Sequence, residues 1–381
     1  MKNTLLRLIY HFFRLTRPRT QSPPRTILIL QYQMPLGCCV HGTPIYAAIK
    51  QANPNVTLIV ATRGLGLATL QHDPNIDHLI ETRDPMQSLQ WRGAVTRQLR
   101  KELKSRNLVA DLILQDAANR RGLFALFALY LRLAPTAGFA DAPPLYDTHL
   151  AYNENLSLLD NNLRLTALVG TPQPHLEPAV YFTAADLTVA RTLLATLDPQ
   201  RPISAFVLQG SGAQQTAWHD DRFAAVIAHA ESLGYQTIFL GTPTDTPTID
   251  RIRTLAHSTG TSLAGRTTIP QLAAILTLCD LLVTVDTGTM HVGRAAGLPM
   301  AVLAPTWQPM IEWLPLNLPN VRILRGPDHF IEYGHVPPNY RLDEIHPPEV
   351  NQAITDLLTT YPPSPEARKS RTQRLLSTTR L

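Results

Sequence analysis

Cysteine and long apolar segments are scarce in this sequence of 381 residues. No apolar run approaches the roughly 18–20 residues that a helix needs to cross a bilayer, and we interpret the longest, Gly122–Leu131, as a buried helix. Cys38 and Cys39 are adjacent, too close for ordinary disulfide geometry, and Cys279 is the only other cysteine. The four-ligand spacing of a zinc site is absent. These absences argue against a membrane-spanning, disulfide-stabilised or zinc-dependent protein and favour the reducing cytoplasm.

Positive charge is concentrated at the two ends of the chain. The net charge is +5, from 34 basic and 29 acidic residues. Residues 1–26 contain six basic residues and no acid, and residues 362–381 contain five basic residues and one acid. The part between them is mildly acidic, which argues against a nucleic-acid-binding protein. We expect residues 1–25 to form a basic amphipathic segment that either contacts the anionic inner face of the cytoplasmic membrane or packs on the protein itself. We expect residues 362–381 to be a basic, flexible tail.

Short β-rich runs alternate with helix-length segments in both halves. The expected strands are 26–32, 56–61, 78–81 and 111–114 in the first half and 203–208, 237–240, 281–285 and 300–303 in the second. Near-continuous apolar strands separated by helices predict parallel sheets covered on both faces. The proline-rich linker 170–178 divides the two series. We therefore predict an α/β protein with two doubly wound, Rossmann-like domains, 26–169 and 179–345, facing each other across a cleft and followed by a helix at 346–361.

The most informative motif follows the expected strand 281–285. It reads Asp286-Thr287-Gly288-Thr289-Met290-His291 and leads into a helix. The backbone N–H groups of such a turn and the helix dipole together favour an anion. Gly288 lets a phosphate approach the backbone, and Asp286 offers acceptors for sugar hydroxyls. The same residues also fit an ordinary helix cap with a satisfied histidine, so the spacing alone leaves both interpretations open.

Two other strand-to-helix junctions carry weaker signals. Gly210-Ser211-Gly212 is a glycine-rich turn after the first strand of the second half, and it is consistent with either a phosphate-facing turn or an ordinary loop. Gly241 and Asp245 follow the next strand, where an acid can bind ribose hydroxyls. Ligands of doubly wound sheets gather at the carboxyl ends of the strands. These residues are therefore candidates for the same ligand site as Asp286.

Together these motifs resemble glycosyltransferase family 9, the lipopolysaccharide heptosyltransferase family. Asp286–His291 followed by Ala295-Ala-Gly-Leu-Pro299 is similar to the family's D-[ST]-G-x-x-H … A-x-G-x-P signature. Leu36–Pro44 is similar to its L-G-D-x-x-H-x-x-P loop, and Asn119-Arg-Arg121 resembles its N-x-R motif. The resemblance covers about residues 26–325. It implies a GT-B fold, with the acceptor on the N-terminal domain and the nucleotide-sugar on the C-terminal one.

The implied activity is an inverting, metal-independent sugar transfer without a cofactor. The donor would be a nucleotide-diphosphate sugar of the ADP-heptose type, and the acceptor a lipopolysaccharide or other lipid-linked or cell-surface glycan. The absence of an Asp-x-Asp motif agrees with metal independence. We expect donor-binding roles for Gly210, Ser211, Thr216, Gly241, Asp245, Asp286, Thr287, Gly288 and His291, and acceptor-binding roles for Gly37, Asn119 and Arg121.

Two positions depart from the family pattern. Cys38 stands where the family has its catalytic Asp, and Thr216 stands where it has a Lys. A base must take the proton of the acceptor hydroxyl in such a transfer. Three hypotheses follow: His41 is the base, Cys38 acts as a thiolate, or the protein binds a nucleotide-sugar or glycan without transferring it. An epimerase acting on a nucleotide-sugar is a further alternative, in which Asp116 or Glu81 would supply the cleft carboxylates.

Overall fold

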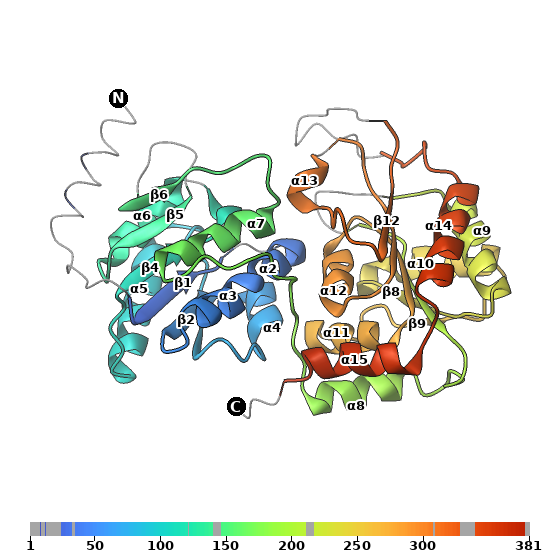
Figure 1. Ribbon diagram of the computed structural model, residues 1–381, viewed down its shortest axis with the longest axis horizontal. Helices are drawn as coiled ribbons and strands as arrows, with labels where there is room; N and C mark the ends of the chain where they lie inside the picture. The colour runs from blue at the N-terminus through green and yellow to red at the C-terminus, as the bar shows by residue number, and fades with distance from the viewer. Residues whose placement is uncertain are drawn as a thin grey trace. The chain divides into compact units, whose positions relative to one another are not determined.

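The structure is a computed structural model that describes residues 8, 12, 24–32, 35–120, 122–139, 146–210, 217–307, 309–327 and 340–377. For residues 89, 91 and 119 it describes the backbone alone. The chain divides into two compact units, Met1–Pro178 and Ala179–Leu381 (Figure 1). Residues 172–181, which contain the end of the first unit and the start of the second, form neither helix nor strand.

The described part of the first unit is built on a six-stranded parallel sheet in the order β3-β2-β1-β4-β5-β6. Its strands are β1 (Thr26–Leu30), β2 (Thr57–Thr62), β3 (His78–Glu81), β4 (Leu112–Gln115), β5 (Thr136–Phe139) and β6 (Thr148–Leu150). In the central register, Leu28 lies opposite Ile59 on one side and Ile113 on the other. The central strands β1 and β2 are largely apolar and buried, as expected of a sheet whose two faces are covered by helices.

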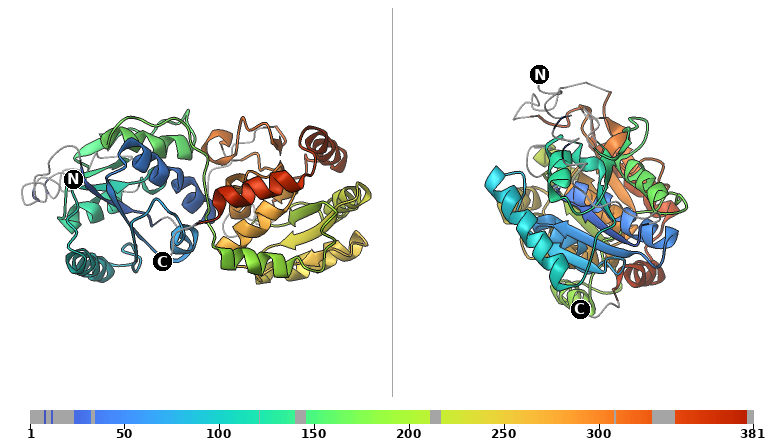
Figure 2. Two further views of the ribbon diagram at one scale, coloured as in Figure 1. Left: turned by 60° about the horizontal axis from the view of Figure 1, so that its bottom comes forward. Right: turned by 90° about the vertical axis from the view of Figure 1, so that its left-hand side faces the viewer.

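Helices of the first unit lie on both sides of its sheet, as the right-hand view of Figure 2 shows. They are α2 (Leu36–Gly42), α3 (Pro44–Ala52), α4 (Gly64–Leu70), α5 (Leu89–Ser105), α6 (Gly122–Leu131) and α7 (Leu158–Leu163), with the 3-10 helices η1 (Ala117–Asn119) and η2 (Arg164–Leu168). Helices α5 and α6 pack on one face, where Tyr32 contacts Phe124 and Phe127 with ring centroids 6.3 and 6.1 Å away. Helix α6 is the apolar run predicted to be a buried helix, and most of it is buried.

The second unit repeats this topology. Its sheet runs β12-β11-β10-β7-β8-β9. When the strands of each unit are numbered from one along the chain, both sheets have the order 3-2-1-4-5-6. The strands are β7 (Ile203–Val207), β8 (Gln236–Leu240), β9 (Thr261–Ser262), β10 (Leu281–Val285), β11 (Met300–Leu303) and β12 (Val321–Leu324). The helices are α8 (Ala184–Leu193), α9 (Asp220–Ser232), η4 (Pro243–Asp245), α10 (Thr246–Leu255), α11 (Ile269–Leu278), α12 (Gly288–Ala296), α13 (Met310–Trp313), α14 (Pro347–Thr360) and α15 (Pro365–Leu375). This is the Rossmann order in both units.

The prediction of a flexible tail at 362–381 is wrong for the residues described there. Residues Pro365–Leu375 form α15, which begins at the capping residue Ser364 and packs beside α11 (Figures 1 and 2). Arg368 forms an ion pair with the buried Asp280, with Nη2 at 2.5 Å from Oδ2. The basic composition of this segment favours a solvated tail. Instead, the arginines of α15 donate to backbone carbonyls at the ends of other helices and to a buried carboxylate. Both α14 and α15 therefore belong to the second unit rather than following it.

No helix within the described residues is long and apolar enough to cross a membrane.

Candidate functional site

The strand order of the second sheet reverses between β7 and β10. These strands are neighbours, and the order runs outward from them through β8 and β9 on one side and through β11 and β12 on the other. Doubly wound sheets bind ligands at such a switch point, outside the carboxyl ends of the strands. Gly210 follows β7 and Asp286 directly follows β10, so the structure brings these two predicted donor residues to one edge.

The first turn of α12 has the backbone chemistry of a phosphate site. Thr287 is its extended N-cap residue (φ −159°, ψ 167°), and its side chain makes no capping hydrogen bond. The turn, which lies entirely within the described residues, also carries no acidic side chain. N–H groups in the first turn of a helix have no partner four residues back, and the helix dipole adds partial positive charge there. In α12 the N–H of Met290 donates to the Thr287 carbonyl oxygen at 3.0 Å, which leaves those of Gly288 and Thr289 for a ligand. The turn that begins at Gly288 is therefore suited to hold an anion.

Asp286 and His291 adjoin this turn from within the protein. Their side chains are buried, at 1% and 4% exposed. Burial, followed by the positive charge of Arg294, lowers the pKa of His291 to about 3. The imidazole is therefore neutral near pH 7 and offers one donor and one acceptor nitrogen. It can hydrogen-bond a ligand but adds no positive charge to the site.

Gly241 and Asp245 have a local structural role. The Oδ2 atom of Asp245 accepts hydrogen bonds from the backbone N–H of Thr242 at 2.6 Å and from its hydroxyl at 2.9 Å. These bonds cap the short helix η4. A Cβ atom at Gly241 would lie 2.8 Å from the same oxygen. This cap explains both residues without a ribose. Ser211 and Thr216 lie outside the described residues.

The corresponding switch point of the first sheet lies between β1 and β4. Helix α2 follows β1 there and carries Gly37, Cys38 and His41. The side chains of Cys38 and His41 are buried, at 5% and 0% exposed. They stand three residues apart and are therefore neighbours on the helix surface. All three cysteines of the chain lie within the described residues, and none forms a disulfide.

Asp116 is a candidate that the family motifs missed. It directly follows β4 at the same switch point, and its side chain is 2% exposed. Glu81, the other carboxylate considered for an epimerase, is exposed at the end of β3, two strands away from β1. The place of Asp116 directly after a predicted central strand is the signal that could have identified it.

The predicted acceptor residues of the η1 region are only partly described. The backbone of Asn119 belongs to η1, its side chain is not described, and Arg121 lies outside the described residues. Within the described ranges, no group of three or more His, Cys, Asp or Glu side chains is placed to hold a metal ion.

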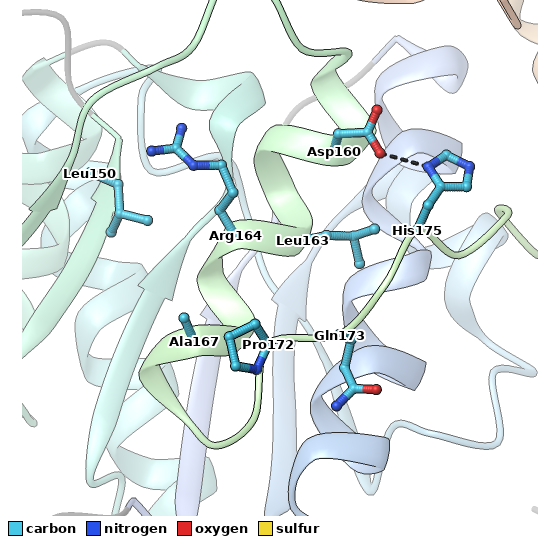
Figure 3. A pocket seen from close by; sticks show the side chains of 8 residues that line it. All are labelled: Leu150, Asp160, Leu163, Arg164, Ala167, Pro172, Gln173 and His175. Atoms are coloured by element: carbon cyan, nitrogen blue, oxygen red, sulfur yellow. Dashed lines mark hydrogen bonds and ion pairs between the residues drawn. The ribbon is translucent and has the colours of Figure 1, made fainter. Parts of the chain in front are cut away.

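A pocket of about 450 Å³ in the first unit contains none of the predicted site residues (Figure 3). His175 lies at this pocket, with Nδ1 at 2.6 Å from Asp160 Oδ1 and Nε2 at 2.7 Å from Glu177 Oε1. Desolvation acts to lower the pKa of His175, but its hydrogen bonds to the two carboxylates outweigh that effect and raise the pKa. The cluster ties the segment that leaves the unit to α7.

Comparison with known proteins agrees with this arrangement of motifs. Residues 97–317 match glycosyltransferase family 9 (heptosyltransferase). The chain is 23% identical over 314 residues to the lipopolysaccharide core heptosyltransferase OpsX of Haemophilus influenzae, covering 80% of this chain and 86% of OpsX.

Two solved structures share the fold. The family 9 glycosyl transferase of Veillonella parvula has a TM-score of 0.75 at 19% identity, covering 91% of this chain and 99% of that chain. The Escherichia coli ADP-heptose lipopolysaccharide heptosyltransferase II has a TM-score of 0.70 at 17% identity, covering 88% and 99%. The two parallel-sheet domains are thus of the GT-B type, as predicted. The chain belongs to glycosyltransferase family 9, the heptosyltransferase family, and is a glycosyltransferase enzyme.

Proposed function

We propose that this glycosyltransferase transfers a heptose from ADP-heptose to a lipopolysaccharide core acceptor, with inversion at the transferred carbon and without a metal ion. The observation that carries the proposal is the first turn of α12, which lacks a side-chain cap and lies at the switch point of the second sheet. The names of the relatives, which refer to ADP-heptose and to the lipopolysaccharide core, support the choice of substrates.

In this proposal the donor diphosphate binds the N–H groups of Gly288 and Thr289, because that of Met290 donates to the Thr287 carbonyl oxygen. Fixed N–H dipoles stabilise the charge that develops on the leaving diphosphate, the task that a cation performs in metal-dependent transferases. Gly288 leaves room for the phosphate, and Asp286 accepts hydrogen bonds from sugar hydroxyls. Neutral His291 contributes a hydrogen bond, because its pKa of about 3 keeps it uncharged. Gly210, Ser211 and Thr216 are proposed to complete the phosphate-binding edge.

The acceptor is proposed to bind the first unit beside α2. Gly37 permits close approach of the glycan. Asn119, in η1 after β4, and Arg121, which lies outside the described residues, are proposed to add contacts. Cys38 and His41 are the catalytic candidates on α2 itself. The base that they or a neighbour provide would be worth about 10²- to 10⁴-fold in rate.

Residues 1–25 are proposed to hold the enzyme at the inner face of the cytoplasmic membrane. Most of this segment lies outside the described residues; Leu8 and Phe12, which are described, are 63% and 57% exposed. Its six basic residues would each gain about 1 kcal/mol near an anionic surface. Sedimentation with anionic but not with zwitterionic vesicles, lost at high salt, is the expected result. Equal binding to both would contradict the proposal.

A thermal-shift screen tests the donor site. Millimolar ADP and ADP-heptose should raise the unfolding temperature, whereas UDP and GDP should raise it less. Transfer of heptose to a heptose-free lipopolysaccharide core, followed by mass spectrometry, then tests the reaction. The absence of a shift with all three nucleotides would overturn the proposed donor site, and a larger shift with UDP or GDP would replace the donor.

A further inference from the structure

Asp116 places a buried carboxylate at the center of the first unit's switch point. It is the first residue after β4, in extended conformation (φ −69°, ψ 167°), and it is the N-cap residue of η1. Its side chain makes no capping hydrogen bond to that 3-10 helix. At 2% exposure the side chain lies almost wholly within the protein. The carboxylate of Asp116 is therefore held inside the protein rather than at the cap of η1.

The carboxylate of Asp116 lies against α2. A Cβ atom built at Gly42, in the last turn of α2, would lie 3.9 Å from Asp116 Oδ2. Cys38 stands four residues before Gly42 and therefore occupies the same face of the helix, one turn toward its N-terminus. One helical turn rises about 5.4 Å. Asp116 thus offers a carboxylate beside the helix face on which Cys38 lies.

The negative charge of Asp116 contributes to the raised pKa values of neighbouring side chains. Burial, and after it the charge of Asp116, raises the pKa of the Tyr46 phenol well above its usual value. The same two causes raise the pKa of Tyr146. Burial raises the pKa of the Cys39 thiol to about 12, a hydrogen bond from Gln31 opposes this, and the charge of Asp116 adds to it. The carboxylate is therefore close to α2, to α3 and to the segment before β6.

Asn162 ties the residue after Asp116 to α2. The backbone N–H of Ala117 donates to Asn162 Oδ1 at 2.7 Å, and Asn162 Nδ2 donates to the carbonyl oxygen of His41 at 3.4 Å. Asn162 is itself buried at 1% exposure. The bridge fixes the start of η1 relative to α2, and so fixes where the Asp116 carboxylate stands relative to Cys38 and His41.

We propose that Asp116 is the general base of the transfer reaction, an inference that rests on the function proposed above. Asp116 Oδ accepts the proton of the acceptor hydroxyl, directly or through one water molecule. The hydroxyl oxygen forms the new bond to the donor sugar carbon as that carbon's bond to the diphosphate breaks. The electron pair of the broken bond leaves on the nucleoside diphosphate, and Asp116 later releases the proton to water.

Other groups at this edge fit the role less well. Among the described residues of α2 and of the segments that directly follow β1 and β4, Asp116 is the one carboxylate. The Cys39 thiol, with a pKa of about 12, stays protonated at neutral pH. Asp116 therefore supplies a carboxylate beside the position where Cys38 replaces the Asp of the family pattern.

Three variants and a matched control test the proposal. Asp116→Asn should lower kcat by about 10²- to 10⁴-fold with an unchanged ADP thermal shift, and should abolish the acidic limb of the kcat–pH profile. Asp116→Glu should retain part of the activity. Cys38→Asp introduced into Asp116→Asn should restore activity at least tenfold. Glu154→Gln, at an exposed position between β6 and α7, makes a matched carboxylate-to-amide change and should behave as the wild type.

The readout is release of ADP from ADP-heptose, with and without the heptose-free lipopolysaccharide core. Wild-type kcat in Asp116→Asn, or an unchanged acidic limb, would overturn the inference while leaving the proposed function intact. Release of ADP by the wild type no faster than without enzyme would contradict the proposed transfer, on which the inference rests. If ADP does not bind the wild type, the proposed function fails instead. A lowered unfolding temperature in Asp116→Asn, with no rescue by Asp116→Glu or Cys38→Asp, would indicate a structural role.

Discussion

The two units of this enzyme share a strand order but differ at the switch-point edge of the sheet, where we propose that ligands bind. At the switch point of the second unit, the first turn of α12 has no side-chain cap, and the neutral His291 adjoins it. At the switch point of the first unit, α2 and the end of β4 bring together buried thiol, imidazole and carboxylate side chains. We propose that one edge offers N–H groups to an anion and that the other offers groups that exchange protons.

This difference indicates that the strand order determines where a site can form, whereas a few residues at that edge determine which chemistry it can perform. Parallel strands in the same order create a switch point in each unit. In the second unit, glycine and threonine after β10 keep the helix N-terminus open. In the first unit, Asp116 after β4 and Cys38 on α2 fill the equivalent place with titratable side chains. Matched substitutions in the two units should therefore differ in their effects on stability and on ADP binding.

The largest effect is expected at the ion pair that joins α15 to the second unit. Asp280 is 2% exposed on its side chain, and its Oδ2 atom also accepts the backbone N–H of Ile203 at 2.9 Å. Arg368→Met leaves this carboxylate buried without its cation, which should cost about 3–5 kcal/mol of unfolding free energy. Arg100→Met in the first unit removes a bond to the Leu131 carbonyl from an exposed arginine, and should cost less than about 1 kcal/mol. Chemical denaturation measures both; equal losses would contradict the assignment of α15 to the core.

A smaller loss is expected where α12 packs on its sheet. A Cβ atom at Gly293 would lie 2.4 Å from Leu282 Cδ2 and 3.0 Å from Met300 Sδ. Gly293→Ala must displace α12 or these buried side chains, at a cost of about 1–3 kcal/mol. Because α12 carries the proposed phosphate turn, the thermal shift with ADP should fall as well. A variant as stable as the wild type would show that the helix can move without cost.

Two histidines should give the units opposite pH dependences. In the second unit, the pKa of His291 is lowered to about 3, so the unfolded chain binds a proton that the folded chain does not. Stability should therefore fall by up to about 1.4 kcal/mol per pH unit between pH 6.5 and 3. His291→Gln should lose this component, which unfolding at a series of pH values would show.

In the first unit, the pKa of His175 is raised by Asp160 and Glu177 against desolvation. Its stabilising contribution is present below pH 6.5 and is lost as the pH rises through the raised value. His175→Gln should therefore change stability mainly at acidic pH, and in the direction of destabilisation. A variant that is equally destabilised at every pH would show a packing role rather than a charge role.

The smallest effect is the same substitution as at Gly293, placed in the first unit. A Cβ atom at Gly42 would meet only ordinary contacts, with Asp116 Oδ2 and Gln31 Nε2 at 3.9 Å. Gly42→Ala should therefore stabilise the chain by about 0.5–1 kcal/mol, because glycine in a helix costs backbone entropy. A destabilised variant would indicate that the space between α2 and Asp116 must remain open.

The sequence predicted the central strands and the motif after β10, because both are marked by local patterns. Apolar runs flanked by helices identify β1, β2, β7 and β10 wherever they lie in the sheet. The short strands β6 and β9 lack such runs, since three and two residues cannot show a period. The docking of α15 was missed for another reason: its arginines bind groups far away in the chain, such as Asp280, so their partners are not visible in the sequence.

The proton-exchanging edge of the first unit was only partly predictable. Cys38 and His41 were found because they fall inside a motif on one helix. Asp116 lies far along the chain from both and meets α2 only because β4 pairs with β1. Proximity of this kind depends on sheet order, which the spacing of residues along one chain does not reveal.

The most direct test of the central claim adds one negative charge to the start of α12. Gly288→Asp places a carboxylate where the phosphate is proposed to bind, and an acid at a helix N-terminus should not destabilise the helix. Ala184→Asp makes the matched change at the exposed first residue of α8. We predict that calorimetric titration shows at least tenfold weaker ADP binding, about 1.4 kcal/mol, for Gly288→Asp and wild-type binding for Ala184→Asp. Wild-type ADP affinity in a folded Gly288→Asp protein would contradict the account.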